Sequence, residues 1–275
     1  MFRQILFALA VTIATFASLG EARADQALKP KSTTFSADLT GLWWNPNESG
    51  WGINIVQQSE IIFATLYVYG SNGQPLWLVG PNVAFSSADT SGAYLFSGPL
   101  YQTSGPFFGS SFNPSAVGAT QVGTISLRFT SYDALQLTYS VGSTTVSKNL
   151  VPQTWRVNNL AGTYIGGMYG VAANCALPVL GIGTNLLTFT IGTSGTAVSM
   201  SLRNATGNSC NLSGTASQRG KLTNVDGTYS CTNGSNGQFA IRRLEAGIDG
   251  LSGAYFELST GCTATVATIG AARVQ

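Results

Sequence analysis

The sequence contains no histidine, and this absence removes several kinds of catalytic and metal site at once. Ser–His–Asp and Cys–His mechanisms both need an imidazole that takes and returns a proton, so neither is available to this chain. Zinc sites with histidine ligands are excluded in the same way, and the four cysteines lack the C-x-x-C spacing of metal and redox motifs. We therefore expect no metal and no cofactor.

Charge is also scarce. Only 9% of the residues are charged, the formal net charge is +2, and no block of basic residues occurs. A phosphate backbone would find little to bind, so we do not expect nucleic acid as a partner. After residue 24 no stretch approaches 18 consecutive apolar residues, so the mature chain is expected to have no transmembrane helix.

Residues 1–24 have the three parts of a secretory signal peptide. Arg3 precedes the apolar run Ile5–Leu19, and the small-residue site Ala22-Arg23-Ala24 follows. The apolar run has about 15 residues, short of the roughly 20 that span a bilayer, which favours cleavage over a membrane anchor. We expect export to the periplasm or the medium, between which the sequence does not distinguish, and a flexible segment over residues 25–38.

What the sequence has in abundance is glycine, with Ser, Thr and Asn between short β-branched runs, as in an all-β protein with tight turns. Ile125, Leu127 and Phe129 alternate with polar residues, which predicts a strand with one face on a core and one in water. Asn72-Gly73 predicts a type I′ hairpin turn. The Gly-, Pro- and Ser-rich segment Pro106–Ala119 predicts a long loop.

The chain divides into two units of about eight strands each. All five tryptophans precede residue 156 and all four cysteines follow it, and Leu160–Tyr164 echoes Leu39–Trp43. We predict two small antiparallel domains, over residues 39–156 and 157–275. Closure removes unpaired strand edges, which favours up-and-down β-barrels over β-sandwiches. An eight-stranded barrel holds packed side chains or one small ligand.

Four cysteines in an exported chain indicate two disulfides, for which three pairings are possible. We favour Cys210 with Cys231, since these residues would face each other across a hairpin that turns near Arg219-Gly220. The second pair would then be Cys175 with Cys262.

One segment, Gly41-Leu-Trp-Trp-Asn-Pro-Asn-Glu-Ser-Gly-Trp-Gly52, resembles a motif of a secreted bacterial β-domain family of uncharacterised function. Tyr69–Trp77, Leu100–Gly109 and Val122-Gly123 fit the same family, over roughly residues 39–155. The second half looks like a Cys-containing companion domain, through Tyr229-Ser-Cys231 and Gly261-Cys262. The resemblance implies secretion and a β fold, and brings no catalytic residues.

Gly41-Leu42-Trp43 is also similar to the Gly-x-Trp that opens lipocalin- and avidin-type barrels. That similarity implies a cavity for a small ligand, although the tryptophan of such barrels often plugs one end.

Trp and Tyr concentrate in the first unit, where they either stack on sugar rings, line an apolar pocket or pack in the core. Trp43 and Trp44 must face opposite sides of a strand, so one should be interior and the other exterior. Glu48 lies between Trp44 and Trp51, where aromatic neighbours could raise its pKa or where it could order its turn by accepting backbone N–H bonds. The candidate ligand-binding residues are Trp44, Asn45, Glu48, Trp51, Tyr69 and Trp77.

The sequence thus favours an exported, non-catalytic protein that binds a glycan or a small apolar ligand on its first unit. One alternative is a structural or surface-interaction protein of the cell envelope without a small ligand. Another is a glycan hydrolase that uses Glu48, for which no second acid is indicated. A single outer-membrane barrel fits poorly, because the strands place Thr and Ser where an apolar outer band is needed.

Overall fold

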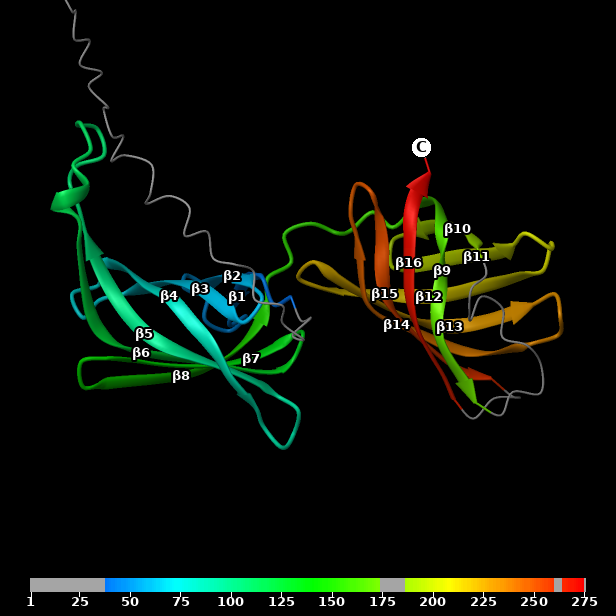
Figure 1. Cartoon of the computed structure of the whole chain (residues 1–275), viewed down its shortest axis with the longest axis horizontal. Coiled ribbons are helices and arrows are strands. Elements are labelled where there is room, and N and C mark those ends of the chain that lie inside the picture. The colour runs from blue at the N-terminus through cyan, green and yellow to red at the C-terminus, as the bar shows by residue number, and fades with distance from the viewer. Residues whose placement is uncertain (1–37, 174–185, 260–263, 275) are drawn as a thin grey trace, which may run out of the picture. The chain divides into compact units, whose positions relative to one another are not determined.

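Both units close into antiparallel β-barrels of eight strands, connected in sequence order (Figure 1). The computed structural model describes residues 38–173, 186–259 and 264–274. The predicted all-β fold and the choice of barrels over sandwiches are confirmed. Within the described residues, no helix is long and apolar enough to cross a membrane.

The first barrel closes through pairing of its first strand with its last. A short 3₁₀ helix, η1 (Pro114–Ala116), lies in the loop between its fifth and sixth strands. Its strands are β1 (Gly41–Trp44), β2 (Gly52–Gln58), β3 (Ile61–Tyr69), β4 (Pro75–Ala88), β5 (Tyr94–Ser104), β6 (Gly118–Ser131), β7 (Ala134–Val141) and β8 (Thr144–Pro152).

The second barrel repeats this topology and closes through its own first and last strands. Its strands are β9 (Gly162–Ala173), β10 (Leu187–Ser194), β11 (Ala197–Asn204), β12 (Ser209–Arg219), β13 (Leu222–Cys231), β14 (Asn236–Ala246), β15 (Gly250–Ser259) and β16 (Ala264–Val274).

The turn between β3 and β4 lies where it is expected but is of a different type. Gly73 has φ of 73° and its N–H donates to the Gly70 carbonyl at 2.9 Å. Among the described non-glycine residues only Ser59 and Arg243 have positive φ, so Asn72 does not. A type I′ turn needs positive φ at both central residues. The type I′ prediction is therefore wrong: Ser71 and Asn72 form the turn, and Gly73 follows in the left-handed region.

Large apolar side chains fill the interior of the first barrel. The alternation predicted on β6 is confirmed, because Ile125, Leu127 and Phe129 are at most 1% exposed. Trp43 points inward and its ring lies 5.3 Å from that of Phe129, edge to face. Phe129 in turn lies 5.9 Å from Phe96. The barrel interior is thus a packed aromatic and aliphatic core.

The two barrels share one hydrogen-bonding arrangement at the start of their first strands. The Trp43 indole donates a hydrogen bond to the Leu39 carbonyl at 3.2 Å, and the Tyr164 hydroxyl donates to the Leu160 carbonyl at 2.9 Å. Each acceptor lies four residues before its donor, and both rings are buried. The echo between Leu39–Trp43 and Leu160–Tyr164 therefore marks equivalent positions, where an aromatic ring plugs one end of a barrel.

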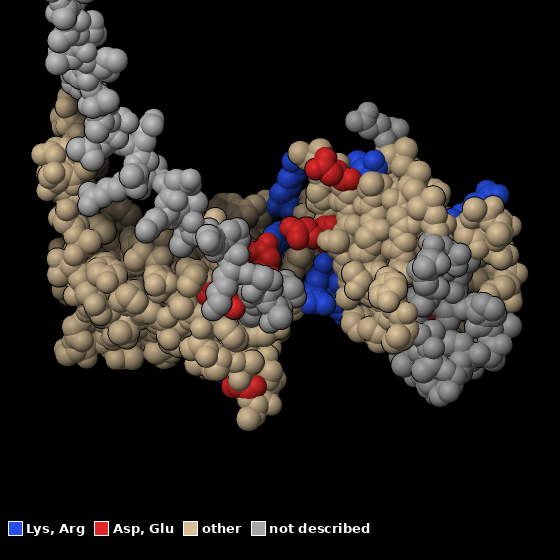
Figure 2. All heavy atoms as spheres, in the orientation of Figure 1, with Lys and Arg blue, Asp and Glu red and all other residues tan. Residues whose placement is uncertain are grey.

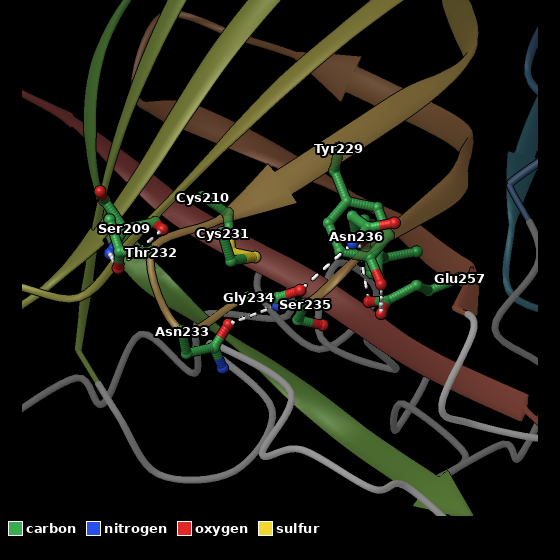
Figure 3. Close-up of a disulfide and its surroundings, with 11 residues drawn as sticks. Ser209, Cys210, Tyr229, Cys231, Thr232, Asn233, Gly234, Ser235, Asn236 and Glu257 are labelled. Atoms are coloured by element: carbon green, nitrogen blue, oxygen red, sulfur yellow. Dashed lines mark hydrogen bonds between the residues drawn. A yellow bond between two sulfur atoms is a disulfide. The ribbon is translucent and has the colours of Figure 1, made fainter.

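The disulfide between Cys210 and Cys231 joins directly opposed residues of β12 and β13, as predicted (Figure 3). The hairpin turns after Arg219, which pairs with Leu222. The predicted Cys175–Cys262 pair lies outside the described residues.

The plug of the second barrel predicts a stability change. Arg273 donates from Nη2 to the Tyr164 hydroxyl at 2.6 Å, and that hydroxyl donates to Leu160. Tyr164→Phe removes both bonds in a buried site, so we expect the free energy of unfolding to fall by about 1–3 kcal/mol in urea titrations.

Tyr169→Phe is the matched control, because Tyr169 lies on the same strand but is 78% exposed. It should change stability by less than about 0.5 kcal/mol. Equal stability of Tyr164→Phe and the parent chain would show that the plug bonds contribute nothing net.

Candidate functional site

The loop from Asn45 to Trp51 is held over one end of the first barrel by its own acid. Glu48 accepts a hydrogen bond from the Trp51 indole at 3.1 Å on Oε2 and an ion-pair bond from Lys148 Nζ at 2.8 Å on Oε1. Lys148 belongs to β8, a hundred residues away in sequence. Glu48 therefore ties the loop that follows β1 to the last strand of the barrel.

These contacts lower the pKa of Glu48. The hydrogen bond from Lys148 is the largest cause, with its charge and the Trp51 indole adding to it. Of the two alternatives for Glu48, a pKa raised by aromatic neighbours is contradicted, because Lys148, a cation that the sequence did not place nearby, stabilises the carboxylate. The carboxylate also accepts from side chains rather than from the backbone N–H groups of its turn.

A row of aromatic side chains crosses the outer wall of the same barrel. Tyr67 of β3 pairs directly with Trp77 of β4, and on its other side with Gly52 of β2. A Cβ at Gly52 would lie 3.9 Å from the Cβ of Trp44, which places Trp44 at the far side of this glycine. We call Trp44, Tyr67 and Trp77 the aromatic row. At about 4.8 Å per strand it spans about 14 Å.

Glycine is required within the aromatic row. A Cβ at Gly52 would lie only 2.9 Å from the backbone oxygen of Trp43, closer than real contacts allow. The missing side chain leaves the space between Trp44 and Tyr67 to their rings. Tyr67 is 48% exposed and Trp77 is 55% exposed, whereas Trp44 is half-buried. As predicted, Trp43 and Trp44 face opposite sides of β1.

The remaining candidate residues connect the row to the loop. Tyr69 is 59% exposed, and its hydroxyl donates to the Gly50 carbonyl at 3.1 Å. The side chain of Asn45 accepts from the Asn47 N–H at 3.0 Å, which orders the turn. The structure thus brings Glu48 and Trp51 into direct contact, places Trp44 and Trp77 on the outer wall, and bridges the two places through Tyr69.

The outer surface of the first barrel is nearly uncharged. Between Gly41 and Pro152 the only cations are Arg128 and Lys148, and both are paired with acids. Arg128 binds Asp89 at 2.6 Å, and hydrogen bonds from Ser91 and Arg128 hold the pKa of Asp89 well below its usual range. Figure 2 shows few charged side chains on the visible face of this barrel.

The interior of the second barrel contains a buried acid near the disulfide (Figure 3). Glu257 is 4% exposed, and its two oxygens accept hydrogen bonds from the hydroxyls of Tyr229 and Tyr255, the latter at 3.1 Å. The ring of Tyr255 stacks on Phe239 with 6.3 Å between centroids. Both carboxylate oxygens are thus satisfied within the barrel, which makes this cluster a fixed polar link between β13 and β15.

The outer wall of the second barrel carries a second surface feature, an open trough of about 620 Å³ across β10–β13. Its outward side chains are hydroxyl and amide groups without charge. They belong to Thr190, Ser199, Ser201, Asn211, Ser213, Thr228 and Ser230.

Sequence reasoning missed Lys148 and the cluster around Glu257. Lys148 stands beside Ser147 in sequence, and nothing local indicates that barrel closure brings it to Glu48. For Glu257 a signal existed: it occupies the inward phase of β15, two residues after the inward Tyr255. A charged residue at an inward position indicates a buried polar pair.

No protein-family model matches this chain. No curated protein matches it either. The chain is similar to the crystal structure of a "putative outer membrane protein" from Bacteroides fragilis NCTC 9343, at 11% identity over 85% of this chain and 95% of that one, with a TM-score of 0.29. A TM-score of that size supports no argument about this chain, and the family resemblance of residues 39–155 stays a prediction.

The Tyr255 phenol predicts an alkaline loss of stability. Burial raises its pKa, and the charge of Glu257 raises it further. Above its ordinary value of 10.0 the unfolded chain loses this proton while the folded barrel keeps it. The free energy of unfolding should therefore fall above pH about 10, by up to about 1.4 kcal/mol per pH unit from this residue.

Tyr255→Phe should lack this part of the alkaline slope, measured by urea unfolding at about pH 9 and about pH 11. The exposed Tyr169→Phe serves as the matched control variant in both measurements. An unchanged slope in Tyr255→Phe would contradict the proposed linkage.

Proposed function

We propose that this chain is an exported, non-catalytic binding protein that holds a glycan on the aromatic row of its first barrel. The observation that supports this most directly is the row itself: Tyr67 pairs with Trp77, and Trp44 lies across Gly52 from Tyr67, on an outer wall with few charges. Sugar rings have apolar C–H faces that stack on such side chains, with hydroxyls left for hydrogen bonds.

The filled interior favours an outer ligand over an enclosed one. Trp43, Phe96 and Phe129 pack inside the barrel in edge-to-face contact, and each is at most 2% exposed. A small apolar ligand would need these rings to move, at the cost of their packing. We therefore favour a glycan over a small apolar ligand.

Polar groups surround the row where the hydroxyls of a glycan would lie. Asn72 and Gln74 are exposed in the turn next to Trp77, and the Tyr69 hydroxyl lies at the neighbouring loop. Their amide and phenol groups donate and accept hydrogen bonds without net charge. A neutral glycan matches this surface better than an acidic one.

The state of Glu48 supports binding over hydrolysis. A glycosidase general acid has a raised pKa, which keeps its proton near neutral pH. The pKa of Glu48 is lowered, and both of its oxygens are engaged by Lys148 and Trp51. Glu48 serves here as a positioning residue that fixes the loop beside the row.

The disulfide supports the location. Cys210 and Cys231 are joined, and structural disulfides persist mainly in oxidising compartments such as the periplasm and the outside of the cell. The proposed signal peptide over residues 1–24 would deliver the chain there.

The aromatic row can be tested with Trp77→Ala. Because Trp77 is 55% exposed, its loss should leave the fold intact and weaken retention on an insoluble glycan at least about tenfold. The measurement is pull-down of the purified mature chain on peptidoglycan, chitin and cellulose.

Tyr169→Ala is the matched control, an exposed aromatic on the outer wall of the other barrel that should keep parental retention. Retention of Trp77→Ala equal to that of the parent, or no retention of the parent on any of the three polysaccharides, would count against the aromatic row. The latter result would favour the structural or surface-interaction role.

A further inference from the structure

The hairpin of β5 and β6 projects beyond the barrel wall. The last residue of β5 that pairs with β4 is Tyr101, and the β6 residue nearest the tip that is bonded to the β7 side is Val122, whose carbonyl accepts from the Gly142 N–H. Beyond those points β5 and β6 pair only with each other, from Gln102 opposite Thr120 to Ser104 opposite Gly118. Figure 1 shows this ribbon and its loop extending past the neighbouring strands. We call residues 102–121 the Phe arm.

Three phenylalanines stand at the tip of the Phe arm with most of their surface in water. Phe107 is 68% exposed, Phe108 is 91% exposed and Phe112 is 64% exposed. The rings of Phe107 and Phe108 lie 4.8 Å apart, so they form one apolar surface. Isolated exposed apolar residues are ordinary, but a cluster of large ones indicates an interaction site.

The Phe arm has no charge. No Lys, Arg, Asp or Glu occurs between Asp89 and Arg128, a span that contains the whole arm. Figure 2 shows only uncharged side chains on its visible face. A partner that binds through ion pairs would therefore find no charged side chain on the arm.

The backbone of the tip is bonded to itself at a few positions and is otherwise open to water. The Ser110 N–H and hydroxyl both donate to the Phe107 carbonyl, at 3.2 Å and 2.8 Å. Asn113 accepts from the Ala116 N–H at 3.1 Å through its carbonyl and from the Ser115 N–H at 3.1 Å through its side chain. Two prolines, Pro106 and Pro114, have no N–H to satisfy.

We infer that the Phe arm inserts its tip into the hydrocarbon edge of a lipid bilayer. A hydrocarbon phase offers no hydrogen-bond partners, so only the three rings enter it, and the N–H groups of Phe107, Phe108 and Phe112, which have no partner within the arm, stay among the hydrated headgroups. A bilayer also accepts a convex apolar tip without a matching groove, whereas a protein partner would need a pocket shaped to three rings. This inference is independent of the glycan proposal, since it uses none of the aromatic row.

The neutral tip sets the kind of membrane binding. Insertion driven by apolar burial does not need anionic lipids and does not weaken as salt rises. Adsorption through charge would show both dependences.

The test is flotation of the purified mature chain with vesicles of zwitterionic phosphatidylcholine, at low and at high salt. The parent should float at both. Phe107→Ser, Phe108→Ser and Phe112→Ser combined should lower the partition coefficient by about a thousandfold, because burial of each ring is worth roughly tenfold. These side chains are exposed, so the variant should melt with the parent.

Ile248→Ser is the matched control, because Ile248 is 91% exposed at the turn between β14 and β15. It should float like the parent. The inference is overturned if the parent does not float, if the triple variant floats equally, or if Ile248→Ser abolishes flotation as well. It is also overturned if the tip instead drives self-association, seen as a lipid-free dimer of the parent that the triple variant lacks.

Discussion

Closure of each sheet through its first and last strands is the constraint on which the rest of this structure depends. In the second barrel β9 and β16 pair over eleven residues. In the first, β1 has four residues, and its pairing with β8 consists of Trp43 opposite Pro152 and Trp44 opposite Val151. The bond from Lys148 to Glu48 lies beside this short seam and joins β8 to the loop that follows β1. Glu48, the candidate acid of a hydrolase, therefore holds the loop after β1 against β8. The contact with Lys148 that does this also lowers the pKa of Glu48.

Closure also decides where a ligand can bind. Each barrel begins with an aromatic residue whose polar hydrogen is bonded to a carbonyl four residues earlier, Trp43 to Leu39 and Tyr164 to Leu160. The buried ring fills one end, and packed side chains fill the interior beyond it. A small barrel with a packed interior can bind a ligand only on its outer wall or its loops. The two proposals for the first barrel therefore concern exposed aromatic residues.

Period-two alternation made most of the fold predictable, because it depends on neighbours within one strand. The inward phase of β6 and the Cys210–Cys231 pair across one hairpin both follow from local sequence. The contact between Glu48 and Lys148 does not follow from local sequence, because only closure of the whole barrel brings together residues that are a hundred positions apart. The type I′ prediction at Asn72 was wrong for a local reason. Asn-Gly fits two turn types, and the extra residue in this loop selects the turn in which Gly73 follows in the left-handed region. The exposed phenylalanines were hidden inside a segment whose glycines and prolines indicated only a loop.

The alternating direction of the strands relates the two surfaces of the first barrel. Connections after β1, β3 and β5 must lie at one end, because successive strands are antiparallel. The Phe arm follows β5, and the aromatic row lies next to the connections after β1 and β3, so both belong to the same end. A barrel whose arm enters a bilayer would hold its aromatic row close to that bilayer, beside glycans attached to the membrane. Each contact alone is small, but two contacts on one rigid barrel act at high effective concentration, which can strengthen binding by about 10²–10⁴-fold without any new contact. Stacking on a neutral glycan and shallow insertion of three rings would then together bind more tightly than either contact does alone.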